Sequence, residues 1–210
     1  MKEEKVYFHS AGVKLEGLLS NPEAFSAKGG VVFCHPHPQH GGEMHNPVIT
    51  SGVQGAYEAG FSTLRFNFRG VGESEGTYSG GIGERGDVLA AVDYLSAVFG
   101  DRDRPLVLMG YSFGAWAGMP VAVRDARIEG MVLVAPPLEM YDFDFLKGCK
   151  KKKQIVAGSE DPFCPPPLIE KWYQSLDDPK SLTILQGADH FFFGHHQSLV
   201  APLAEFFKGL

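Results

Sequence analysis

A series of short apolar runs constrains the fold of this chain most. They are residues 30–34, 61–68, 105–109, 130–134, 153–157 and 181–185. Each run has the length and composition of a buried strand, and helical patterns lie between most of them. Strands that alternate with helices pair in parallel through right-handed crossovers and are covered by helices on both faces. The sequence therefore predicts an α/β fold around a mostly parallel central sheet.

Two earlier segments predict a different kind of pairing. Residues 5–10 and 13–20 are separated only by Ala11-Gly12, which is suited to a tight hairpin turn. We expect these segments to form an antiparallel pair at the N-terminal edge of the sheet.

Two helices have clear sequence limits. The first is expected to begin at Asn46-Pro47, a capping residue followed by proline, and to end before Gly60. The second is expected over residues 84–99, where apolar side chains recur at spacings of three and four and so share one face. The glycine-rich residues 70–86 are interpreted as a long surface loop.

Two more helices contain proline. One should follow Ser112 and be kinked or ended by Pro120, because proline removes a helix hydrogen bond and clashes with the preceding turn. The other is expected over residues 197–208, where Pro202 allows a start several residues later than the pattern suggests.

Length, charge and cysteine content narrow the function. A chain of 210 residues suits one domain, residues 1–210, without a separate cap. The formal net charge of −6 disfavours a nucleic-acid partner. The N-terminus lacks the apolar run of a signal or membrane helix, and three scattered cysteines indicate reduced thiols. We expect a cytoplasmic protein with no membrane partner.

The sharpest local motif is Gly110-Tyr111-Ser112-Phe113-Gly114, which matches G-x-S-x-G between an apolar strand and a helical pattern. A serine at the apex of a sharp strand-to-helix turn projects above the sheet, and the turn closes only if its flanking residues are very small. The position of the motif predicts that Ser112 is a nucleophile.

A serine hydroxyl needs a base, and in this fold class the base follows the acid, which follows the nucleophile. His190 lies just beyond the last predicted strand, where the base is needed. His195 and His196, further into the same loop, are the alternatives.

The acid should stand between serine and histidine at the end of a strand, where its carboxylate can accept a hydrogen bond from the second imidazole nitrogen. Asp161 follows the strand predicted over residues 153–157 and fits this place. Asp142 and Asp144 are the alternatives, and Asp189, next to the base, is expected to cap its own loop.

The anion of a tetrahedral intermediate needs backbone N–H donors. Phe113, directly after the nucleophile, should supply one. The other should come from the loop after residues 30–34, where Pro36 and Pro38 have no N–H to offer. His37 is the first candidate and Gln39 the second.

Two rival sites are disfavoured. His35, His37, His40 and His45 suggest a metal, yet no carboxylate or thiolate cluster completes a ligand set around them. Residues 81–86 match a dinucleotide fingerprint by letter but do not follow a strand. We expect no metal and no cofactor.

Taken together, the motifs resemble the α/β-hydrolase superfamily, and specifically its small, cap-less members near dienelactone-hydrolase-like and carboxylesterase-like proteins. The motifs are residues 35–38 with Gly41-Gly42, residues 65–74, the Ser112 turn, residues 158–161, and Asp189-His190. Dienelactone hydrolases use a cysteine nucleophile where this chain has Ser112. Within residues 65–74, Arg69 is expected to anchor its loop through a carboxylate.

The sequence thus predicts a serine hydrolase that cleaves esters or thioesters of a small acyl substrate through an acyl-enzyme. Peptidase or amidase action is one alternative, and a non-catalytic binding protein on the same fold is another.

Overall fold

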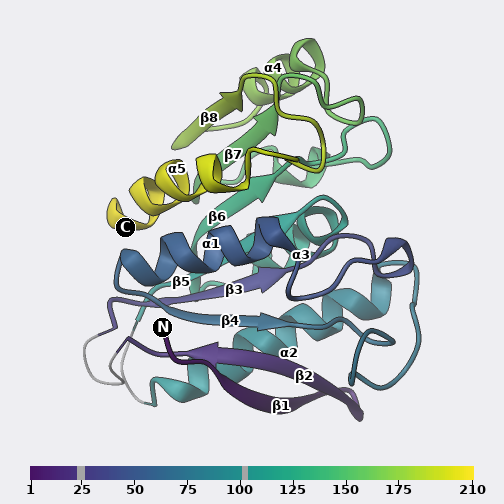
Figure 1. Cartoon of the computed structure of the whole chain (residues 1–210), viewed down its shortest axis with the longest axis vertical. Coiled ribbons are helices and arrows are strands. Elements are labelled where there is room, and N and C mark those ends of the chain that lie inside the picture. Colours follow the sequence, from purple (N-terminus) through teal and green to yellow (C-terminus); the bar gives the residue numbers. More distant parts are fainter. Residues whose placement is uncertain (23–26, 101–103) are drawn as a thin grey trace.

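The computed structural model describes residues 1–22, 27–100 and 104–210. Within these residues, eight strands form one sheet in the order β1-β2-β4-β3-β5-β6-β7-β8 (Figure 1). The strands are β1 (Glu4–Ser10), β2 (Val13–Ser20), β3 (Gly30–Cys34), β4 (Ser62–Phe66), β5 (Leu106–Tyr111), β6 (Ile128–Val134), β7 (Lys152–Gly158) and β8 (Lys180–Leu185). β3 to β8 lie where the apolar runs predicted strands, although β4 is shorter than residues 61–68. β1 and β2 lie at the two N-terminal segments that predicted an antiparallel pair.

The N-terminal edge of the sheet is antiparallel, as predicted. β1 pairs antiparallel with β2, and β2 pairs antiparallel with β4. The hairpin turns at Ala11 and Gly12, which have φ of 47° and 86°, so both residues lie in the left-handed region typical of a two-residue hairpin turn. From β4 to β8 every neighbouring pair is parallel.

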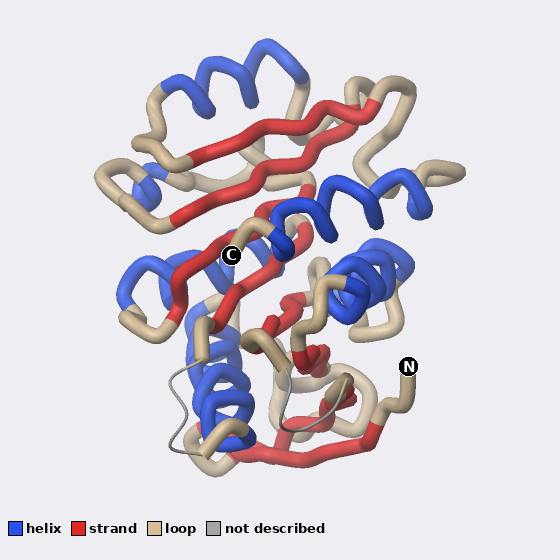
Figure 2. The backbone as a smooth tube through the Cα atoms, turned by 90° about the vertical axis from the view of Figure 1, so that its left-hand side faces the viewer, coloured by secondary structure: helices blue, strands red, loops and turns tan. Residues whose placement is uncertain are grey.

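The two faces of the sheet bury separate sets of side chains, because successive residues of a strand point to opposite faces. In β3, Val31 and Phe33 join one cluster, whereas Val32 and Cys34 join the other. α1 (Pro47–Glu58) and α5 (His196–Lys208) cover the first cluster; α2 (Ile82–Val98) and α3 (Phe113–Arg124) cover the second. Figure 2 shows helices on both sides of the strands.

The first two helices lie near their predicted limits. Asn46 caps α1 by accepting a hydrogen bond from the Val48 N–H at 3.0 Å. α2 begins at Ile82, two residues earlier than predicted, so the expected loop over residues 70–86 ends at Gly81. Its end at Val98 is one residue short of the predicted one.

The prolines disturb the helices less than the sequence suggested. α3 continues through Pro120 to Arg124, and α5 starts at His196 with Pro202 inside it. Both helices are held by packing. Ala115, Ala117, Met119 and Ala122 of α3 are buried, as are several residues of α5. Such burial outweighs the cost of about 3 kcal/mol that an interior proline carries.

One helix was missed entirely. α4 (Pro166–Gln174) follows β7 and begins in a run of three prolines, where proline at the first turn is compatible with a helix. Its only buried residue is Ile169, which joins the same cluster as α2 and α3. At 9 residues, α4 is shorter than the window of about 11 to 18 residues over which a helical period can be recognised in a sequence.

The segment between β6 and β7 bears on access to the sheet edge. Residues 135–151, all of which the structure describes, contain one short 3-10 helix, η2 (Asp144–Leu146).

Across the described parts of the chain, no helix combines the length and apolarity needed to cross a bilayer.

Candidate active site

Ser112 stands at the carboxyl end of β5, on the turn into α3. Its backbone has φ of 53° and ψ of −118°, a conformation that side-chain-bearing residues rarely adopt. The Ser112 N–H donates to the Val134 carbonyl at 2.9 Å, which ties the turn to β6. The strained turn therefore projects the serine side chain out of the sheet.

The glycines on either side of Ser112 are required by space. A Cβ at Gly110 would lie 2.5 Å from the Ala115 nitrogen, and one at Gly114 would lie 2.1 Å from the Cys34 carbonyl oxygen. Both distances are shorter than any van der Waals contact, so the turn closes only with glycine, as predicted from the motif. The Gly114 contact also shows that the start of α3 lies directly against the end of β3.

The structure brings Ser112, His190 and Asp161 together from three strand ends. Ser112 Oγ lies 3.0 Å from His190 Nε2, and His190 Nδ1 lies 2.8 Å from Asp161 Oδ2. An ionised carboxylate can only accept, so Nδ1 carries the imidazole proton and Nε2 is free to accept from the serine hydroxyl. The three residues therefore form a continuous chain of hydrogen bonds.

Both carboxylate oxygens of Asp161 accept hydrogen bonds. Its other carboxylate oxygen, Oδ1, accepts from the backbone N–H groups of Phe163 and Cys164 at 2.8 and 3.2 Å. The side chain is buried, so its orientation toward His190 is fixed by these two bonds.

The alternative acids and bases have other roles. Asp142 accepts from the Asp144 N–H, and Asp144 forms an exposed ion pair with Lys147. Asp189 accepts from the N–H groups of Phe191 and Phe193 and so caps its loop, as expected. His196 contacts the Phe191 carbonyl, and His195 occupies the N-cap position of α5 without a capping hydrogen bond from its side chain.

His190 is positioned by two residues that the sequence did not single out. The Tyr111 hydroxyl donates to the His190 carbonyl at 2.9 Å, and burial raises the pKa of that hydroxyl. The Phe163 ring packs edge-on against the imidazole at a centroid distance of 4.8 Å. Tyr111 belongs to the G-x-S-x-G motif, but nothing in the motif indicates that its hydroxyl reaches the base.

The backbone N–H groups of Phe113 and His37, the two predicted donors, have no acceptor among the described residues. Phe113 is the first residue of α3, where an N–H has no partner within the helix. The Gln39 N–H, in contrast, donates to His37 Nδ1 at 3.2 Å. Of the two candidate donors in this loop, His37 is the one whose N–H remains available.

His35, the first histidine of this loop, serves a structural role. His35 is fully buried, with Nδ1 2.6 Å from the Pro36 carbonyl and Nε2 accepting from the Phe68 N–H at 3.1 Å. Burial lowers the pKa of His35 to about 4, so the ring is neutral. Both of its nitrogens are engaged within the protein. The described residues contain no group of three or more metal-binding side chains.

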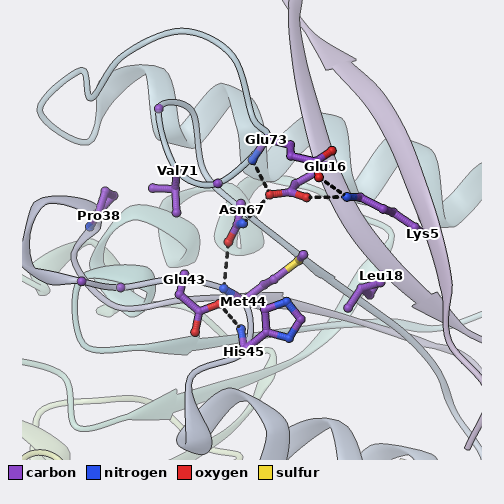
Figure 3. A pocket seen from close by; sticks show the side chains of 14 residues that line it. Lys5, Glu16, Leu18, Pro38, Glu43, Met44, His45, Asn67, Val71 and Glu73 are labelled. Atoms are coloured by element: carbon purple, nitrogen blue, oxygen red, sulfur yellow. Dashed lines mark hydrogen bonds and ion pairs between the residues drawn. The ribbon is translucent and has the colours of Figure 1, made fainter.

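The far end of the loop is held by side chains from the end of β4 (Figure 3). The Asn67 amide oxygen accepts from the Met44 N–H at 2.8 Å, while its NH₂ donates to buried Glu16. Arg65 donates to the Met44 carbonyl at 3.0 Å. Both backbone groups of Met44 are thereby fixed. Asn67 and Arg65 lie in the motif of residues 65–74, yet their partners are distant in sequence.

A cleft of about 310 Å³ opens above Ser112 and His190. One wall, the β3-loop wall, comes from the loop after β3: Pro36, His37, His40, Gly41 and Gly42, with Asn46 beside them. The other, the apolar wall, comes from the loops after β6, β7 and β8: Met140, Tyr141, Phe163 and Phe191. Tyr141 is stacked on Trp116 of α3 at 4.4 Å. The cleft has the size of a small-ligand site.

Two further sequence predictions can be placed. Arg69 donates to both carboxylate oxygens of buried Asp87 in α2, so it anchors its loop as expected. Residues 81–86 form the N-terminus of α2, where Glu84 caps the helix by accepting from the Gly81 N–H. That segment does not follow a strand.

Comparisons with known proteins agree with this fold. The model of the alpha/beta hydrolase family matches residues 31–151. A structure of an alpha/beta serine hydrolase homologue from Coxiella burnetii is 31% identical, with a TM-score of 0.88, and the match covers 98% of this chain and 97% of that one. An alpha/beta serine hydrolase without a lid from Xanthomonas campestris is 27% identical, with a TM-score of 0.84 and coverage of 98% and 94%. An uncharacterized protein of Rickettsia prowazekii is 33% identical over 90% of this chain and 82% of its own.

Proposed function

The chain belongs to the alpha/beta hydrolase family, and we propose that it hydrolyses carboxylic esters or thioesters of small substrates through an acyl-enzyme on Ser112. The observation that carries this proposal is the chain of hydrogen bonds from Ser112 through His190 to Asp161 at the base of an apolar cleft.

The first half-reaction transfers the acyl group to the serine. His190 Nε2 takes the proton of the Ser112 hydroxyl as Oγ attacks the substrate carbonyl carbon. Asp161 accepts a hydrogen bond from Nδ1–H throughout and stabilises the imidazolium that forms. When the tetrahedral intermediate collapses, the alcohol or thiol leaves with the proton from Nε2, and the acyl group remains on Ser112.

The negative charge of the intermediate needs fixed donors. The N–H groups of Phe113 and His37 would donate hydrogen bonds to the oxygen that carries this charge. Both residues line the cleft next to Ser112, and neither N–H is engaged within the described protein. Fixed donors cost no reorganisation during the reaction, and each contributes about 10²- to 10³-fold to turnover in enzymes of this kind.

The second half-reaction reverses the first with water in place of the alcohol. His190 Nε2 removes a proton from water as the water oxygen adds to the acyl carbonyl carbon. When this intermediate collapses, Nε2 returns the proton to Ser112 Oγ and the carboxylic acid leaves. No step requires a metal or cofactor, so full activity after exhaustive chelation is part of the proposal.

The apolar wall supports an apolar acyl group of limited size. A cleft of about 310 Å³ lies at the lower end of small-ligand pockets, and Met140, Phe163 and Phe191 offer it carbon surface. Each methylene that remains in water forgoes about 0.8 kcal/mol of binding. We therefore expect kcat/KM on nitrophenyl esters to favour short acyl chains, with ordinary saturation kinetics in the presence of lipid.

A panel of nitrophenyl esters, acyl thioesters and anilides, assayed with wild-type protein and with Ser112→Ala in the presence of a chelator, tests the proposal. The esters and thioesters should turn over only with Ser112 in place. A protein that hydrolyses none of them and is not labelled by a fluorophosphonate is a binding protein. Faster turnover of anilides than of esters would instead favour the amidase alternative.

A further inference from the structure

The side chain of His37 links two loops. Its Nδ1 accepts from the Gln39 N–H at 3.2 Å, and its Nε2 lies 3.3 Å from the Tyr78 hydroxyl. Nδ1 must keep its lone pair for the Gln39 N–H, so Nε2 carries the proton of the ring. The Tyr78 oxygen therefore accepts a hydrogen bond from Nε2–H. Burial and the neighbouring His40 lower the pKa of His37, which favours this neutral form.

The loop that carries Tyr78 is fixed by contacts with α2 and α3. Glu84, a fully buried residue of α2, accepts from the Ser79 N–H at 2.7 Å and from the Gly81 N–H at 2.8 Å. Gly81 lies so close to Trp116 of α3 that a Cβ there would be 2.2 Å from the indole ring. The loop that carries Tyr78 is thus clamped between α2 and α3.

The backbone around His37 has little remaining freedom. Pro36 has a fixed φ, and Pro38 restricts His37 to extended ψ, which is observed at 121°. The direction of the His37 N–H can still change through rotation about the two bonds that flank the Pro36–His37 peptide. A tether on the imidazole ring opposes that rotation, because the ring moves with the His37 backbone.

We infer that Tyr78 is a positioning residue for the oxyanion donor: its hydroxyl holds the His37 ring and so keeps the backbone N–H of His37 directed into the cleft. The inference rests on the proposed function. Tyr78 is absent from the described residues that line the cleft, so it acts through His37 and not on the substrate.

The first experiment compares Tyr78→Phe with Tyr173→Phe by steady-state kinetics on a nitrophenyl ester. Tyr78→Phe should lower kcat by about tenfold, less than loss of a complete oxyanion donor, and leave KM nearly unchanged. Tyr173→Phe is the matched control, since its hydroxyl donates to the Lys180 carbonyl at 3.2 Å at the opposite end of β8. The control should keep wild-type kcat.

A double-mutant cycle identifies the route of the effect. In His37→Asn the side chain can still accept from the Gln39 N–H, but it is too short to reach Tyr78. This variant should lower kcat by the same factor as Tyr78→Phe, and the double variant should lose no more. Each single variant tests the inference if the other fails to fold.

Three results would overturn the inference: wild-type kcat in Tyr78→Phe, a rise in KM in place of a fall in kcat, or effects of the two substitutions that multiply. Each of these results is obtained with a wild-type protein that hydrolyses the ester, so it is distinct from failure of the proposed function. That failure is recognised separately, by a wild-type protein that hydrolyses no ester and does not react with a fluorophosphonate at Ser112.

Discussion

The β3-loop wall and the apolar wall of the cleft are held in different ways. The β3-loop wall is fixed at its start by His35, at its middle by His37 and Tyr78, and at its far end by Asn67. The apolar wall presents Met140 and Phe191, which are 56% and 52% exposed, with Phe193 packed against Phe191 and 70% exposed.

This difference separates two tasks. Donors that stabilise a transition state must not move, and hydrogen bonds to buried partners provide that rigidity. Side chains that only remove apolar groups from water need area rather than orientation, so they can stay exposed until substrate arrives. Substitutions on the first wall should therefore reduce kcat or stability. Those on the second wall should change KM, except at Phe163, which also packs against His190.

The largest effects should come from the residues between the walls. Ser112→Ala should lower turnover by about a million-fold, as expected for groups that act as one unit, and His190→Ala should be similarly damaging. Asp161→Asn should cost about 10⁴-fold, because the amide no longer selects the correct imidazole tautomer. Steady-state assays with Asp142→Asn provide the control. A loss of this size in Asp142→Asn instead of in Asp161→Asn would show that Asp161 is not the acid.

The next effect concerns the stability of the β3-loop wall. Burial lowers the pKa of His35 to about 4 in the folded protein, against about 6.5 in the unfolded chain. Above pH 6.5 both states are neutral and stability is complete. As the pH falls toward 4, the unfolded chain binds a proton that the folded protein excludes, so His35 removes up to about 3 kcal/mol of unfolding free energy.

Urea unfolding at pH 7 and pH 4.5 measures this loss, and His35→Gln should show a shallower dependence on pH than wild type. His9→Gln, at an exposed position of β1, is the control and should retain the wild-type slope. An unchanged slope in His35→Gln would mean that another group is responsible for the dependence on pH.

The smallest effect is expected on the apolar wall. Phe191→Ala should raise KM for a butyrate ester by about fivefold, equivalent to the apolar surface of one to two methylenes, with little change in kcat. Its half-exposed ring contributes little to folding, so the free energy of unfolding should stay close to that of wild type. Phe193→Ala, which does not line the cleft, should change KM less. A fall in kcat in Phe191→Ala would remove the distinction between the walls.

Much of the fold could be predicted because the relevant signals are local. The continuous apolar run of β3 indicates a strand buried on both faces, and the two glycines around Ser112 encode the sharp turn. The order of Ser112, Asp161 and His190 along the chain, each after a strand, was enough to propose them as one group. Parallel strands bring their carboxyl ends to one edge whatever the intervening sequence.

What could not be predicted depends on contacts between distant segments. Pro120 and Pro202 sit inside helices whose packing is decided by the rest of the molecule. For α5 part of that packing is a close approach to α1, where a Cβ at Gly55 would lie 3.1 Å from the Val200 carbonyl oxygen. The bonds from Asn67 to Met44 and from His37 to Tyr78 cross 23 and 41 residues of sequence. Nothing near Tyr78 in the sequence indicates that it meets the loop after β3.

Direct detection of the acyl-enzyme tests the central claim, that Ser112 carries the acyl group during turnover. Wild-type protein would be mixed with a nitrophenyl ester, quenched in acid within the first turnovers, digested and analysed by mass spectrometry. We predict one added acyl group on the peptide that contains Ser112, present in wild type and absent from Ser112→Ala. Acylation of a different residue, or turnover in Ser112→Ala at the wild-type rate, would contradict the account.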